Sequence, residues 1–124
     1  LYKFISRALK GQPLRIDGDG SMALDFTYVD DTANGIYRVA TTEAAAGETF
    51  NIARGKSESL STAVSIISET IGDVKVEYGD VPAHIPTRGT LDVTKARELL
   101  GFNPEHGLEQ ALPAYIEHLR HNPI

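Results

Sequence analysis

The sequence contains no cysteine and no tryptophan. Without cysteine, the chain can form no disulfide framework, no zinc ribbon and no thiol nucleophile. It also lacks any run of about 18 apolar residues, the length that a membrane-spanning helix needs, and it lacks a secretory leader pattern. We therefore expect no membrane partner and a cytoplasmic location. The first residue is Leu1 rather than methionine, which fits a truncated chain, although a processed N-terminus would look the same.

An excess of positive charge is missing as well. The 124 residues include 12 lysines and arginines against 17 aspartates and glutamates, which gives a formal net charge of -5. Proteins that bind nucleic acids neutralise phosphates with clustered basic side chains. No basic stripe occurs in this sequence, so no nucleic-acid partner is expected. Its hydrophobic content of 41% is enough to build the core of one small domain.

Motifs that would mark a complete active site are absent too. The sequence has no G-x-S-x-G motif, no tyrosine followed four residues later by lysine, and no G-x-G-x-x-G after a strand. We therefore expect no catalytic residue and no dinucleotide binding in this chain alone. The histidines lack the spacing of a helical zinc pair. The run DGDGS at 17–21 does not continue with the ligand pattern of an EF-hand, so it is interpreted as a tight turn, and no metal site is expected.

Hydrophobic periodicity predicts a mixture of helices and strands. Leu60, Val64, Ile67 and Ile71 have the spacing of an amphipathic helix, and short alternating runs indicate strands. The expected helices cover 1–10, 31–40, 59–71, 92–100 and 108–119, and the expected strands cover 14–17, 24–29, 47–53 and 74–78. Asp30 or Asp31 should cap the second helix, Pro113 should disturb the last one, and 81–88 should be an irregular loop. The fold class predicted is a small mixed α/β (α+β) domain.

Four segments carry a more specific pattern. They are GQPLRIDGDGSMALDFTYVDD at 11–31, TFNIARGKSESL at 49–60, RGTLDVTKARELLGFNP at 88–104 and GLEQALPAYIEHLR at 107–120. In order and spacing, these segments resemble the extended short-chain dehydrogenase/reductase family of NAD-dependent epimerases, dehydratases and decarboxylases. Within this family, the resemblance is to the UDP-glucose 4-epimerase-like members. The resemblance covers nearly the whole chain.

This resemblance implies that the chain is the C-terminal, substrate-binding part of a two-part isomerase or lyase. In that family an N-terminal Rossmann domain holds NAD and the catalytic tyrosine and lysine. This chain would bind a nucleoside-diphosphate sugar and would need the Rossmann domain as its partner, while a homodimer stays open. The alternatives are a free-standing, non-enzymatic module that binds nucleotide sugars or serves assembly, and a degenerate remnant with a structural role.

The resemblance also implies individual binding residues. Arg15 and Asp17 fall on the strand that lies along the nucleotide base in relatives. Arg88 matches the arginine that meets the diphosphate or ribose, for which a guanidinium fork is suited; the alternative for Arg88 is a surface ion pair. Leu60 would line the base pocket, although its helical spacing equally fits a core position. Asn51 is expected to brace the backbone rather than to meet the ligand.

Leu24 departs from the family pattern, which has a phosphate-binding arginine at that position. The leucine removes a charge, and this places more weight on Arg88. Phe26 matches the aromatic residue of the pattern and is expected to pack beside the ligand. After Arg88 the family often has an acidic residue that meets the ribose, whereas this chain continues with Gly89-Thr90-Leu91.

A physical expectation follows for the segments near 31–53. If they are built to pack on a Rossmann domain, the helix at 31–40 and the strand at 49–53 should expose apolar faces in this chain alone. Exposed apolar patches of this kind favour self-association.

Overall fold

The computed structural model describes residues 1–82, 86 and 88–123. Its helices are α1 (Tyr2–Leu9), α2 (Val29–Thr41), α3 (Leu60–Ile71), α4 (Thr94–Leu100) and α5 (Leu108–His121), with a 3-10 turn, η1 (Glu43–Ala45). Its strands are β1 (Leu14–Asp17), β2 (Ala23–Asp25), β3 (Ser57–Ser59) and β4 (Val76–Gly79). The predicted mixed α/β class is confirmed. Residues 83–85 and 87 of the expected loop at 81–88 lie outside the described residues.

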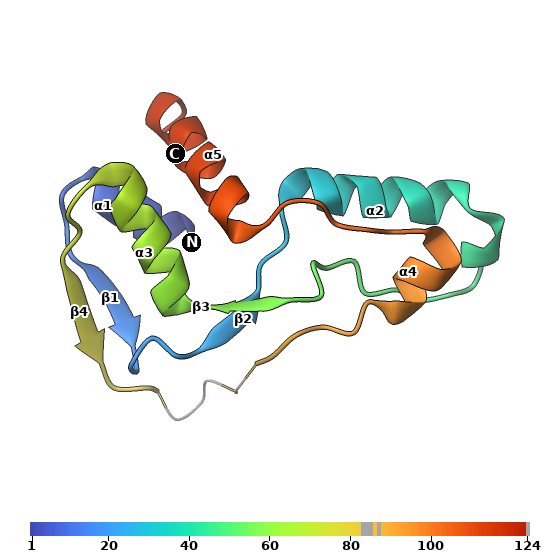
Figure 1. Ribbon diagram of the computed structural model, residues 1–124, viewed down its shortest axis with the longest axis horizontal. Helices are drawn as coiled ribbons and strands as arrows, with labels where there is room; N and C mark the ends of the chain where they lie inside the picture. The colour runs from blue at the N-terminus through green and yellow to red at the C-terminus, as the bar shows by residue number, and fades with distance from the viewer. Residues whose placement is uncertain (83–85, 87, 124) are drawn as a thin grey trace.

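Two small sheets organise an elongated molecule (Figure 1). β1 and β4 pair in parallel, with Leu14 opposite Val76 and Asp17 opposite Gly79. β2 and β3 pair antiparallel, with Leu24 opposite Glu58. In Figure 1 the β1–β4 pair lies at one end with α1, α3 and α5, whereas α2 and α4 occupy the other end, and the β2–β3 pair runs between them.

Each end has its own hydrophobic cluster. The larger cluster joins α1, β1, α3 and α5 through buried residues that include Ile5, Leu14, Ile67, Leu112 and Ile116. The smaller one joins η1, α4 and the segment after it through Ala45, Ala96, Leu100 and Phe102, with Val39, Phe50 and Ile52 packed against them. The β2–β3 pair therefore connects two separately packed ends. A site beside this pair can be lined by residues from both ends of the molecule.

Local signals account well for α3. Ser59 Oγ accepts a hydrogen bond from the Thr62 backbone N–H at 3.0 Å, which is the capping arrangement expected of serine at a helix start. Gly72 ends the helix with φ of +115°, a conformation that favours glycine. The helix predicted for this part of the chain is confirmed, with Ser59 rather than Ser61 as its cap.

The strand predicted at 47–53 is wrong: this segment belongs to neither sheet. Phe50 and Ile52 turn inward onto the smaller cluster, whereas Thr49 and Asn51 face outward, so the alternation typical of a strand is present. A strand also needs a hydrogen-bonding neighbour, and no other strand in the described part of the chain pairs with this segment. The strand predicted at 24–29 is shorter than expected, because its partner β3 has only three residues.

One face of α2 is apolar and exposed. Val29, Ile36 and Tyr37 are 68%, 60% and 66% exposed, and Ala33 and Ala40 on the same face are also exposed. The opposite face packs inward through Gly35, where an added Cβ would collide with Ile52 Cγ2 and lie 3.1 Å from Phe102 Cε2. We call Val29, Ala33, Ile36, Tyr37 and Ala40 the α2 stripe. The apolar face expected on this helix is therefore present, whereas the one expected on the 49–53 segment is not, because Phe50 and Ile52 pack onto the smaller cluster.

Candidate functional site

Three of the residues predicted to bind substrate come together in one pocket. The pocket has a volume of about 520 Å³ and is lined by residues 24–26 of β2 and the turn after it, and by residues 88–91. Leu24 and Phe26 contribute half-buried apolar walls, and the exposed Arg88 contributes a guanidinium group. We call it the Arg88 pocket. An apolar wall beside a permanent positive charge suits a ligand that combines a ring with an anionic group.

Asp25 holds the two loops that flank this pocket. Its Oδ1 accepts a hydrogen bond from the Arg54 backbone N–H at 3.1 Å, and its Oδ2 accepts from the N–H groups of Gly55 at 3.0 Å and Leu91 at 3.2 Å. Asp25 was not among the predicted site residues. One sequence signal is available for it, because aspartate is disfavoured inside a strand and LDF places it between two apolar residues.

Further hydrogen bonds fix the loop that follows Arg88. The Ser57 backbone N–H donates to Thr90 Oγ1 at 3.2 Å, and the two hydroxyl oxygens lie 2.7 Å apart. Asn51 Nδ2 donates to the Asp92 backbone oxygen at 2.8 Å, which confirms the bracing role expected for Asn51. The Asp92 carboxylate accepts a hydrogen bond from the Thr94 N–H. This bond, together with one from the Thr94 side chain, lowers the pKa of Asp92. Polar contacts therefore tie residues 90–92 to β3 and to the 49–53 segment.

Arg15 and Asp17 lie on β1 and do not line the Arg88 pocket. Arg15 Nε and Asp17 Oδ1 are 3.3 Å apart and form an exposed ion pair. The Arg15 guanidinium lies over Gly79 of β4, where an added Cβ would be 3.0 Å from one of its nitrogens. The two residues therefore form a separate polar surface on the β1–β4 pair.

Leu60 also lies outside the Arg88 pocket. It is the first residue of α3, is half-buried, and its backbone N–H donates to the Met22 oxygen at 2.9 Å. This backbone hydrogen bond continues the β2–β3 connection into the helix, and the binding role of Leu60 stays a prediction.

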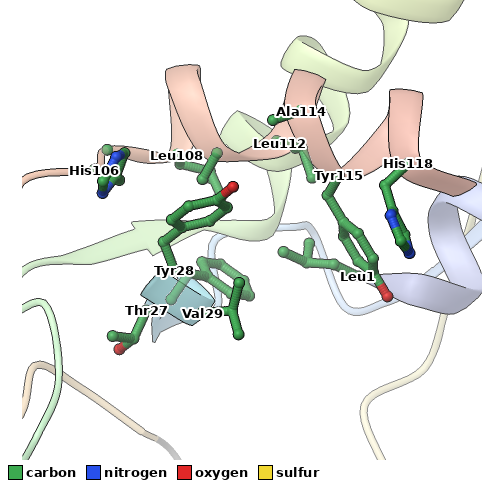
Figure 2. A pocket seen from close by; sticks show the side chains of 13 residues that line it. Leu1, Thr27, Tyr28, Val29, His106, Leu108, Leu112, Ala114, Tyr115 and His118 are labelled. Atoms are coloured by element: carbon green, nitrogen blue, oxygen red, sulfur yellow. The ribbon is translucent and has the colours of Figure 1, made fainter. Parts of the chain in front are cut away.

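A second, more apolar groove lies between α5 and the connection from β2 to α2 (Figure 2). Its volume is about 510 Å³, and its lining includes Leu1, Phe26, Tyr28, Tyr115 and His106. Phe26 therefore contributes to both this groove and the Arg88 pocket. In Figure 2 Tyr28 lies beside His106, and their ring centroids are 4.7 Å apart.

Asp31 anchors this groove instead of capping α2. Helix α2 begins at Val29 after Tyr28, without a side-chain cap. Asp31 is 5% exposed and accepts hydrogen bonds from the backbone N–H groups of Glu105 and His106, each at 3.0 Å, while His106 Nδ1 lies 3.1 Å away. Burial alone would raise the pKa of Asp31, but these hydrogen bonds outweigh it and lower the pKa below 3.8. The capping prediction for Asp30 or Asp31 is wrong because Asp31 connects distant segments.

Comparison with known proteins shows which family the chain resembles. Residues 1–53 match the model of the NAD dependent epimerase/dehydratase family. Over that segment the chain is similar to this family, and its small mixed fold matches part of the fold of a UDP-glucuronic acid 4-epimerase. Within the described residues, no helix combines the length and apolar character needed to cross a bilayer.

Similar proteins are named for activities on UDP-sugars. An uncharacterized UDP-glucose epimerase of Bacillus subtilis, YtcB, is 33% identical over 119 residues, covering 95% of this chain and 38% of that protein. A UDP-glucuronate 4-epimerase of Thermodesulfobacterium geofontis is 31% identical over 124 residues, covering 98% of this chain and 38% of that protein. The chain therefore spans little more than a third of the length of these relatives.

Solved structures give the same picture. Bacillus cereus UDP-glucuronic acid 4-epimerase, in complex with UDP-glucuronic acid and NAD, superposes with a TM-score of 0.90 at 27% identity. The match covers 98% of this chain and 39% of that protein. Thermotoga maritima UDP-glucose 4-epimerase with UDP-glucose superposes with a TM-score of 0.88 at 30% identity, covering 97% of this chain and 38% of that one.

Proposed function

We propose that the chain binds the nucleoside-diphosphate portion of a UDP-sugar, as the C-terminal part of an NAD-dependent sugar-nucleotide epimerase or dehydratase, and that it is not catalytic alone. The observation that carries this proposal is the Arg88 pocket, in which two motif segments far apart in sequence meet. The guanidinium fork of Arg88 suits diphosphate oxygens. Leu24 and Phe26 offer the apolar surface on which a base or sugar ring can pack.

The names of the relatives support uridine as the base. The two sequence relatives described above are named for UDP-glucose and UDP-glucuronate, and the two solved structures hold UDP-glucuronic acid and UDP-glucose. Arg15 and Asp17 are proposed to add contacts along β1 when a ligand extends beyond the Arg88 pocket. In the absence of ligand, the ion pair between Arg15 and Asp17 neutralises the charge of both side chains.

Hydride transfer is proposed to reside in a partner domain that binds NAD. Such a domain would cover two surfaces of this chain. One is the apolar α2 stripe, and the other is the outward side of the 48–53 segment, whose backbone groups can form hydrogen bonds. In this arrangement the chain supplies binding energy remote from the reacting carbon. Remote binding accelerates a reaction by holding the substrate in the orientation that the transition state requires.

Isothermal titration of the 124-residue chain tests the binding proposal. UDP and UDP-glucose are expected to give saturable heats, with weaker binding of dTDP-glucose and none of glucose. Comparing UDP with UDP-glucose separates the contribution of the nucleoside diphosphate to binding from that of the sugar. Absence of heat with both UDP and UDP-glucose would refute nucleotide-sugar binding by this chain. Binding of glucose as strong as that of UDP-glucose would refute the assigned role of the diphosphate.

A further inference from the structure

The loop that carries Arg88 is not held in place by burial. Arg88, Gly89, Thr90 and Leu91 are all exposed, and Leu91 is 47% exposed despite its apolar side chain. Exposed segments with few apolar contacts occupy many conformations unless hydrogen bonds restrict them. The position of this loop therefore depends on the polar contacts made by its backbone and by Thr90.

Asp25 provides the contact nearest to the pocket wall. It is the last residue of β2, so its backbone is fixed by the pairing of β2 with β3. Its carboxylate accepts hydrogen bonds from Arg54, Gly55 and Leu91, which belong to two loops. A hydrogen bond from an N–H group to an ionised carboxylate is stronger than one between neutral groups. One side chain thus joins the strand that carries Leu24 to the loop that carries Arg88.

The turn at 54–55 closes the other side of this arrangement. Gly55 has φ of +74°, and an added Cβ would lie 2.6 Å from Val93 Cγ2. Val93 is buried immediately before α4, so the turn can neither move closer nor accept a side chain. Asp25 is therefore enclosed by a tightly packed turn on one side and an exposed loop on the other. Of these two, the exposed loop is the one expected to shift when the carboxylate is altered, because only the hydrogen bonds around Thr90 and Asp92 then hold it.

We infer that Asp25 is a positioning residue for ligand binding, which holds the 88–91 loop so that the Arg88 guanidinium faces the ligand diphosphate. This inference rests on the function proposed above for Arg88. Restricting a binding loop before the ligand arrives reduces the conformational entropy lost on binding. In this proposal Asp25, although it lines the pocket, acts on the ligand through the position of Arg88.

A double-mutant cycle tests this inference with UDP as the probe. Asp25→Asn keeps the side-chain size but replaces one acceptor oxygen with an amide donor, and it is expected to weaken UDP binding about ten-fold. Because Asp25 acts through Arg88, the double variant with Arg88→Ala should bind UDP no more weakly than Arg88→Ala alone. If the losses of UDP binding free energy in the two single variants add up in the double variant, the inference is overturned. Asp73→Asn, at an exposed position remote from the pocket, is the matched control.

Amide hydrogen exchange and backbone relaxation measured by NMR provide a readout that needs no ligand. In Asp25→Asn, the amides of Gly55 and Leu91 should exchange faster and the 88–91 backbone should become more mobile, while the Leu14 and Gly18 amides of the β1–β4 pair stay protected. Unchanged exchange at Leu91 and unchanged mobility at Arg88 would overturn the inference. If the wild type binds no UDP, the proposed function fails, and the NMR result still decides whether Asp25 positions the loop.

Leu91→Pro covers the case in which Asp25→Asn does not fold. This substitution deletes the single N–H group that joins the 88–91 loop to Asp25 and leaves the bonds from Arg54 and Gly55 in place. A folded Leu91→Pro chain should lose affinity for UDP about as much as Asp25→Asn does. Wild-type affinity in a folded Leu91→Pro chain would overturn the inference.

Discussion

Arg88 is the residue on which the binding proposal depends most directly. Arg88→Ala is expected to weaken UDP binding by about 1.5–3 kcal/mol, the range for a hydrogen bond to a charged group. Arg88→Lys should give an intermediate loss, because lysine keeps the charge but not the planar fork. Titration calorimetry measures both. Arg120→Ala on α5, whose guanidinium pairs with Glu117, is the control and should bind normally; equal losses in the Arg88 and Arg120 variants would contradict the assignment.

Asp31 makes the stability of the chain depend on pH. Its pKa is lower in the folded chain than its ordinary value of 3.8. The folded state therefore gains stability from ionised Asp31 above that value and loses it as the pH falls through the folded pKa. Asp31→Asn should reduce the free energy of unfolding at pH 7 by about 1.5–3 kcal/mol, because a buried acceptor of two backbone N–H groups is weakened.

Denaturant unfolding at several pH values measures this effect. The stability of the wild type should fall more steeply than that of Asp31→Asn below about pH 4. Asp19, Glu48, Glu58 and Asp92 also have lowered pKa values, and they contribute equally to both curves. The difference between the two curves thus isolates Asp31. Parallel curves would show that the Asp31 carboxylate does not stabilise the link between α2 and the segment before α5.

Sequence alone predicts some of the residues that line the Arg88 pocket and misses others for a physical reason. Leu24, Phe26 and Arg88 were predicted because each occupies a recognisable place in an ordered motif, and all three line one pocket. The roles of Asp25 and Asp31 were missed because their partners are backbone N–H groups of distant loops. The position of Asp25 between two apolar strand residues marks it as unusual but does not reveal those partners. A side chain that accepts from the main chain becomes visible only when the fold brings the loops together.

At the scale of secondary-structure elements, α2 depends on a close approach at Gly35. A methyl group at this position would overlap Ile52 and press on Phe102. Gly35→Ala is expected to lower the free energy of unfolding by about 1–3 kcal/mol despite the better helix propensity of alanine, because overpacking outweighs it. Thermal unfolding measures the change. The control Ala33→Gly, on the exposed face, should lose only about 0.5–1 kcal/mol, and a stabilised Gly35→Ala chain would contradict the packing.

The cap of α3 gives a second prediction at this scale. Ser59→Ala removes the acceptor for the Thr62 N–H and should lower the free energy of unfolding by about 1 kcal/mol. Ser65→Ala, at an exposed position in the interior of α3, should be neutral or slightly stabilising. Urea unfolding of the two variants compares them directly. Equal stability of both variants would show that the cap contributes nothing.

Elements with clear local signals were predicted correctly, whereas the strand predicted at 47–53 is wrong because it has no pairing partner among the described residues. The cap at Ser59 and the stop at Gly72 determine α3 from its own residues. The 47–53 segment has the residue pattern of a strand, but a strand is completed only by a hydrogen-bonded neighbour. No strand of the described residues fills that role. The sequence therefore correctly predicts the alternation of inward and outward side chains in this segment. The strand itself is wrongly predicted.

At the scale of the whole molecule, the α2 stripe should govern association. Exposed apolar faces promote contact between molecules, so the chain is expected to self-associate as its concentration rises. Ile36→Glu with Tyr37→Glu should shift the chain toward monomer without loss of helical circular dichroism. Sedimentation velocity measures the shift. Tyr78→Lys, on the exposed side of β4, is the control and should associate like the wild type; a wild type that stays monomeric would contradict the expectation.

The parallel β1–β4 pair has a consequence for the order of folding. Its two strands lie at 14–17 and 76–79, so pairing them closes a chain that includes α2, β3 and α3. Loop closure becomes entropically more costly as the enclosed chain lengthens, by about 0.6 kcal/mol for each doubling. Contacts between α1 and α3, which directly precede β1 and β4 in the sequence, reduce the length of chain that the strand pairing must still close. We expect the β1–β4 pair to form after the helices have docked, so that the rate of folding is set by helix packing.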